Sequence, residues 1–171
     1  MEKILKHMAW ANHHILTKVS ELPDEALDAY LVNPEWTVRE IARHIASSAT
    51  WYGWRLLDKS NFTEIETAAW QEKLDRSEIQ PVKMADLQIV IDRLKAADEV
   101  LLNEAALPEG VVVREWEGKT IVRARSTVIS QAVHHATEHR AQLIAALEAR
   151  GFNGINLDDF DHWAFASTIG E

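Results

Sequence analysis

Four stretches of this 171-residue chain repeat apolar residues at the spacing that forms one buried face of a helix. They run over residues 2–20, 37–57, 83–106 and 126–150. Between the last two, the segment VVVREWEGKTIVRA has two β-rich halves around Gly118 and predicts a β-hairpin over Val111–Arg123. The pattern predicts an all-α fold, a four-helix bundle with a β-hairpin insertion between helices three and four. We expect a single domain over residues 1–171.

The ends of two predicted helices carry capping residues. Thr37 followed by Glu40 has the spacing of a capping box and opens the second helix. Ser126 or Thr127 is expected to cap the fourth helix, and Gly151 to end it.

Three further segments lack a sustained helical period. Residues 22–36 predict a connection with one short helical turn, and residues 61–80 predict a polar loop. The tail over residues 152–171 is apolar enough to dock on another surface. Docking on this chain and docking on a partner subunit both remain open at this stage.

Composition removes several classes of function. The chain has no cysteine, so thiol nucleophiles and cysteine-ligated metals are excluded and any metal must use His, Asp or Glu. Its formal net charge of −9, with no basic run, argues against nucleic-acid and anionic-membrane partners. No segment has the composition of a signal peptide or a membrane span, so we expect a cytoplasmic protein.

Three of the eight histidines have a spacing that suits a metal ion. His135 and His139 are four residues apart and project from one face of the fourth helix, where two imidazoles can bind one ion. His44 lies at the margin of the apolar stripe of the second helix, which can pack against the fourth. A lone histidine beside a core is more often a hydrogen-bonded filler, so a metal site and three structural histidines remain alternatives.

Other polar and aromatic residues have structural interpretations at this stage. Asn12 falls inside an apolar stripe and needs an internal partner. Arg55 and Arg140 could meet a substrate carboxylate, but surface ion pairs are the expected role. Glu138 points away from the core and predicts a surface carboxylate. Core or interface packing is expected for Trp10, Trp51 and Trp54, with a wall above the metal as the alternative.

Four segments give the chain a resemblance to a known family. They are MAWANHHIL, TVREIARHIASSATWYGWRL, EWEGKT and HHATEHRAQL. The chain resembles the DinB/YfiT-like family of helical-bundle proteins along nearly its whole length. The resemblance implies a divalent metal bound by His44, His135 and His139. The family pattern continues with Arg, Gly and Gln, where this chain has Arg140, Ala141 and Gln142, a change that leaves the ligands intact.

The resemblance also implies classes of activity. Characterised relatives include thiol-dependent S-transferases and a thiol-dependent isomerase that use low-molecular-weight thiols. We therefore expect a metal-dependent enzyme of thiol S-transferase or hydrolase type acting on a small molecule. The alternative is a non-catalytic metal- or ligand-binding protein in stress response or interaction. Nickel or zinc is the expected ion, and imidazole also accepts manganese or iron. Relatives commonly pair through bundle faces, and seven tryptophans suit an interface, so we expect a homodimer.

Overall fold

A computed structural model describes residues 2–171 of the chain. Six α-helices, three short 3₁₀ turns and one two-stranded sheet make up its regular structure. The helices are α1 (Glu2–Val19), α2 (Val38–Leu56), α3 (Glu64–Ser77), α4 (Leu87–Ala105), α5 (Arg125–Glu148) and α6 (His162–Thr168). The strands are β1 (Val111–Trp116) and β2 (Lys119–Ala124). The predicted helical class with one β-hairpin is confirmed.

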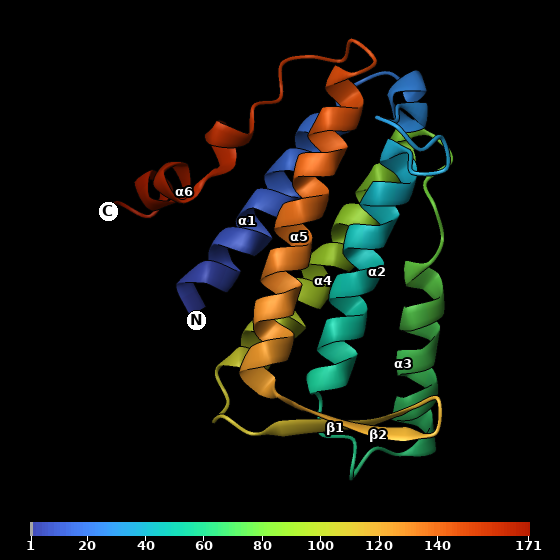
Figure 1. Cartoon of the computed structure of the whole chain (residues 1–171), viewed down its shortest axis with the longest axis vertical. Coiled ribbons are helices and arrows are strands. Elements are labelled where there is room, and N and C mark those ends of the chain that lie inside the picture. The colour runs from blue at the N-terminus through green and yellow to red at the C-terminus, as the bar shows by residue number, and fades with distance from the viewer. Residues whose placement is uncertain (1) are drawn as a thin grey trace.

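The four long helices, α1, α2, α4 and α5, run side by side and enclose the core (Figure 1). Helix α2 packs against both α4 and α5, and α1 packs against the same two helices. The apolar stripes predicted from the sequence supply the buried side chains between them. The most deeply buried include Leu5, Ile15, Ile41, Leu87, Ile91, Leu94, Leu101 and Leu143. Removing these apolar surfaces from water is the main stabilising contribution.

The N-cap predicted from the sequence agrees with the structure for α2 and disagrees with it for α5. The Thr37 side chain accepts a hydrogen bond from the backbone N–H of Glu40, so the predicted N-cap of α2 is confirmed. The predicted cap of α5 by Ser126 or Thr127 is wrong, because Ala124 occupies the N-cap position and the helix begins at Arg125. The Ser126 hydroxyl instead donates to the Glu109 carboxylate at 3.1 Å.

The polar loop predicted over residues 61–80 is also wrong, because it contains helix α3. The helix has almost no apolar face: only Leu74 and Ser77 are buried, so the sequence carried no period to detect. A capping box formed by Thr63 and Glu66 starts it. It packs on α2, where the Trp70 and Trp54 rings lie 5.6 Å apart.

The β-hairpin lies across one end of the long helices (Figure 1). Its antiparallel register pairs Val112 with Arg123 and Trp116 with Lys119. Glu117 and Gly118 form the turn with positive φ angles, as the favoured two-residue hairpin turn requires. The hairpin predicted over Val111–Arg123 is confirmed.

The C-terminal segment docks on the chain's own first helix. Phe165 of α6 is buried, and its ring lies 5.6 Å from that of Trp10 on α1. His7 on the same helix hydrogen-bonds the carbonyl oxygen of Phe160 at 2.8 Å. This contact answers the question that the sequence left open about the tail. Within residues 2–171, no helix has both the length and the apolarity needed to cross a membrane.

Candidate metal centre

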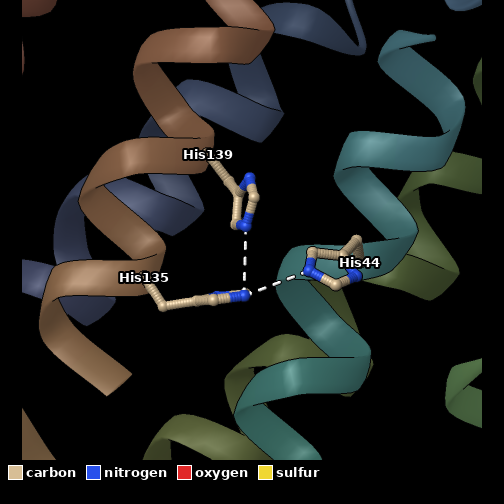
Figure 2. Close-up of side chains that lie close together, drawn as sticks. All are labelled: His44, His135 and His139. Carbon is tan, nitrogen blue, oxygen red and sulfur yellow. Dashed lines mark hydrogen bonds between the residues drawn. The ribbon is translucent and has the colours of Figure 1, made fainter. Parts of the chain in front are cut away.

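The three histidines singled out by the sequence meet at one point between α2 and α5 (Figure 2). His44 projects from α2, and His135 and His139 project from α5. The Nε2 atom of His135 lies 3.0 Å from Nε2 of His44 and 3.0 Å from Nε2 of His139. One nitrogen from each ring falls within 4.8 Å of the other two. All three side chains are half-buried.

Helix geometry and helix packing each supply one part of this arrangement. The four-residue spacing places His135 and His139 one turn apart on the same face of α5. Helix α2 packs against that face, and this contact brings in His44. The first part is local and the second is tertiary.

Hydrogen bonding outside the cluster fixes the orientation of the His139 ring and the tautomer of its neutral form. Its Nδ1 lies 2.8 Å from the Gln142 amide oxygen, which also accepts a hydrogen bond from Trp36 Nε1 at 2.8 Å. An indole N–H can only donate, so the group at this position is the amide oxygen. His139 must then donate from Nδ1, which in the neutral ring leaves a lone pair on Nε2 facing the cluster.

Electrostatics keep two of the rings neutral. Burial, together with the charges of the neighbouring His139 and His44, lowers the pKa of His135 to about 4. Burial also lowers the pKa of His44, with additional contributions from His139 and Arg43. A neutral imidazole is the form that binds a metal, so these rings are ready to act as ligands at neutral pH.

The donor set fits a divalent metal ion. A proton on His135 Nε2 points in one direction and cannot form linear hydrogen bonds to both neighbouring nitrogens. An ion in the middle can accept a lone pair from each ring. Bonds of about 2.0–2.1 Å place two nitrogens on one ion roughly 2.9–3.4 Å apart, and the two 3.0 Å separations lie in that range.

A cleft of about 910 Å³ opens beside the cluster. It lies between the α2 and α5 helices and the β-hairpin, and Ser48 and Tyr52 belong to its wall. Both residues also adjoin the cluster. Ser48 Oγ lies 3.5 Å from His135 Nε2, and the Tyr52 ring centre lies 5.7 Å from that of His135. Ser48 and Tyr52 therefore join the wall of the cleft to His135, while the histidines are not part of that wall.

Sequence reasoning missed two supporting residues. Trp36, which lies in a predicted connection, packs edge-on against His44 and His139, with ring centres 5.1 and 5.5 Å away. Gln142 belongs to the family pattern that follows His139, but the sequence analysis assigns it no role in orienting that ring. Its position three residues after His139, on the next turn of the helix, is the signal that could have identified it.

The other predicted residues have mixed outcomes. Glu138 is exposed and pairs with His134 at 3.2 Å, which confirms the surface interpretation. The prediction of surface ion pairs is wrong for both arginines. Arg140 is buried. Arg55 lines the cleft and has no carboxylate partner among residues 2–171. Arg140 is also the internal partner that Asn12 needed, because its Nη1 donates to Asn12 Oδ1 at 2.6 Å.

Two of the three tryptophans considered above line the cleft. Trp51 and Trp54 are in its wall, whereas Trp10 packs on the C-terminal segment. For Trp51 and Trp54, the alternative interpretation as walls of a pocket therefore describes their position better than core packing.

The fold and the site together define a helical protein with a candidate three-histidine metal centre at the edge of a cleft. Comparison with known protein families identifies the chain more specifically. The sequence model of the DinB family matches residues 1–169. The chain belongs to the DinB family. Neither the curated proteins nor the solved structures include a significant match to it.

Proposed function

We propose that the chain binds one divalent metal ion through His44, His135 and His139 and uses it as a metal-dependent enzyme. The reaction is of thiol S-transferase or hydrolase type, on a small molecule held in the neighbouring cleft. The observation that carries the proposal is the convergence of three histidine Nε2 atoms beside a cleft large enough for a substrate.

The chain's own residues hold and orient the ligand set. Gln142 and Trp36 fix the ring of His139, while burial keeps His44 and His135 unprotonated. When bound, a divalent ion supplies Lewis-acid chemistry that makes water or a thiol nucleophilic near neutral pH. Ser48 and Tyr52 stand between the histidines and the cleft, where they can contact a substrate.

The ligand type narrows the metal to ions that accept imidazole. We propose nickel or zinc, with manganese and iron as the other candidates. Among residues 2–171, the group that could hold an ion consists of three histidines and includes no carboxylate. Three protein ligands leave a coordination position open, which is the arrangement of catalytic rather than structural zinc sites.

The second candidate function is metal or ligand binding without turnover, in stress response or interaction. The large cleft beside the histidines favours the enzyme, because a site that only stores an ion or stabilises the fold has no need of a substrate cavity.

A low-molecular-weight thiol as co-substrate, a cytoplasmic location and a homodimer complete the proposal. The exposed ring of Trp163, which lies outside the cleft, supports the dimer, because aromatic rings are enriched at interfaces. Light scattering at micromolar concentration should give twice the chain mass of 19.4 kDa.

The proposal is tested by comparing wild type, His139→Ala and the control His134→Ala. His134 is exposed on the same helix, five residues before His139, and its partner among residues 2–171 is Glu138. Elemental analysis should find about one divalent ion per chain in wild type and in the control, and almost none in His139→Ala. Circular dichroism should show that all three proteins are folded, because apolar stripes form the core.

Activity is then screened with small thiols plus electrophiles, and with hydrolysable esters and amides. Turnover that disappears on chelation and in His139→Ala supports the enzyme. Stoichiometric metal without turnover supports the non-catalytic alternative, and full metal content in His139→Ala contradicts the metal centre itself.

A further inference from the structure

The cleft beside the histidines is positively charged although the chain carries a formal net charge of −9. Its wall contains four cationic side chains, Arg55, Lys59, Arg114 and Arg123, and one carboxylate, Glu115. The Glu115 carboxylate accepts a hydrogen bond from Thr120 at 2.6 Å. A local excess of positive charge in an acidic protein indicates a site for an anion.

Three of these cations have no anionic partner. Among residues 2–171, no carboxylate forms a salt bridge with Arg55, Arg114 or Arg123. The Lys59 ammonium donates to the carbonyl oxygens of Trp54 and Leu57 at 2.8 and 2.9 Å, and Arg123 donates from Nη1 alone to the carbonyl oxygen of Val122 at 2.9 Å. The three guanidinium groups therefore keep most of their donors available for a ligand.

The register of the hairpin aims two of these arginines in the same direction. Arg114 pairs with Ile121, and Arg123 pairs with Val112. Residues directly paired across antiparallel strands share a face, and positions two apart on one strand share it as well. Arg114 and Arg123 therefore lie diagonally on the face that Val112 packs against the core. Arg55 reaches the same cleft from the last turn of α2.

Burial and mutual repulsion act on Arg55 in particular. The side chain is half-buried, and its pKa is lowered first by burial and then by the charge of Arg114. Two like charges near each other in a partly dehydrated cleft destabilise the empty site. An anion between them relieves this repulsion and accepts hydrogen bonds from planar donor groups suited to acid groups.

Apolar surface lies beside the charge. Trp51, Trp54 and Trp116 line the cleft together with Val112 and Ile121. Trp51 and Trp116 are exposed, so their rings are available to a ligand. The wall thus combines flat aromatic surfaces with cations, which suits a molecule that has both an apolar body and an acid group.

We propose that this cleft binds an organic anion with an apolar body and presents it to the three histidines as substrate. The acid group is held by Arg55 and Arg114, with Arg123 beside them, and the apolar body lies on the tryptophans. The opposite end of the molecule reaches the metal centre past Ser48 and Tyr52, which adjoin both the cleft and His135. The role as substrate rests on the proposed metal-dependent function, whereas the preference for an anion does not.

The test compares three probes of the same shape: 4-phenylbutyrate, 4-phenylbutyramide and 4-phenylbutylamine. Isothermal titration calorimetry is done first on metal-free wild type, so that no probe can bind an ion. We expect the acid to bind at least about tenfold more tightly than the amide, and the amine to bind most weakly. Added salt should weaken binding of the acid more than binding of the amide.

The double variant Arg55→Gln, Arg114→Gln should lose roughly tenfold or more in affinity for the acid and keep its affinity for the amide. The control is Arg76→Gln, which removes an exposed arginine of α3 paired with Glu72 and should leave both affinities unchanged. Equal affinity for acid and amide in wild type, or no binding of either, overturns the proposal without relying on the variants.

The same measurements separate this proposal from the proposed function. If metal binds as expected but the acid has no advantage over the amide, the anion site is wrong and the metal centre stands. If the acid is preferred but His139→Ala retains its metal, the metal centre is wrong and the anion site stands. If the double variant prefers the acid as strongly as wild type does, the assignment of the anion site to Arg55 and Arg114 is wrong.

Discussion

Two consecutive residues of α5, His139 and Arg140, belong to two polar clusters of different character. A helix turns by about 100° per residue, so the two side chains leave α5 on different sides. His139 faces α2 and joins the half-buried histidine cluster beside the cleft. Arg140 faces α1 and joins Asn12 in the core, near Asp98 of α4.

The buried cluster is held by the chain itself. Arg140 donates from Nη1 to Asn12 and from Nη2 to Thr137 Oγ1 at 3.1 Å. Burial lowers the pKa of Arg140 to about 10 and raises that of Asp98 to about 7. The Asn12 amide and the Arg140 charge offset part of the shift at Asp98. Removing the charge of Arg140 or of Asp98 therefore changes the free energy of unfolding.

The histidine cluster is held in a different way. Its rings are oriented from outside by Gln142 and Trp36, while the nitrogens inside point at one another. Lone pairs that meet beside a cleft can bind a ligand, whereas the polar groups of the closed core contact one another. The comparison teaches that burial and access to solvent, more than residue type, separate a structural polar cluster from a functional one.

The largest effect is expected from breaking the buried cluster at Arg140. Arg140→Met leaves the Asp98 carboxyl without its nearby cation and Asn12 without its donor, and should lower the free energy of unfolding by about 3–5 kcal/mol. The neighbouring change His139→Ala should lower it by about 1 kcal/mol or less in the metal-free protein. Urea denaturation measures both. Equal losses would contradict the division into structural and functional clusters.

Asp98 should give the stability a distinctive pH dependence. Its pKa in the folded state, about 7, is above the ordinary value of 3.8, so the folded protein holds a proton that the unfolded chain releases. The resulting stability is complete below the unfolded pKa and is lost as the pH rises through 7. Between pH 5 and 8, wild type should lose about 2–3 kcal/mol relative to Asp98→Asn. Parallel urea stability curves for the two proteins would show that Asp98 is ionised throughout.

Removing the external support of His139 tests the second cluster. Gln142→Ala leaves all three proposed ligands in place but frees the His139 ring, and should weaken metal binding by roughly 10- to 100-fold. Competition with a chromogenic chelator measures the affinity. Gln88→Ala is the matched control, because Gln88 is exposed on α4 and its side chain donates to Asp92, a contact remote from the histidines. An unchanged metal affinity in Gln142→Ala would show that Gln142 does not orient His139 for metal binding.

The smallest effect is a pH dependence of opposite sign at His135. Its folded pKa of about 4 lies below the ordinary 6.5, so the unfolded chain takes up a proton first as the pH falls. Stability is complete above 6.5 and is lost as the pH falls toward 4. The half-exposed ring is screened by solvent, so we expect about 1 kcal/mol or less. The measurement compares metal-free wild type with His135→Gln, and a larger loss in the variant on acidification would contradict it.

The sequence by itself determined the features that depend on neighbouring residues. Apolar stripes located the four long helices, the Thr37 cap located the start of α2, and the β-rich halves around Gly118 located the hairpin. The spacing of His135 and His139 was equally local. Each of these signals is the period or the end of a single element, and the backbone geometry of that element translates it directly into structure.

Tertiary structure decided everything that required two elements to meet. Only packing could bring His44 to the α5 pair, place Trp36 against Gln142, and set Arg55 opposite the arginines of the hairpin. It also buried Arg140, and it supported α3 against α2 although that helix has little apolar face. These contacts depend on the angle, rotation and offset between elements, which arise from the fit of many side chains and leave no short pattern in the sequence.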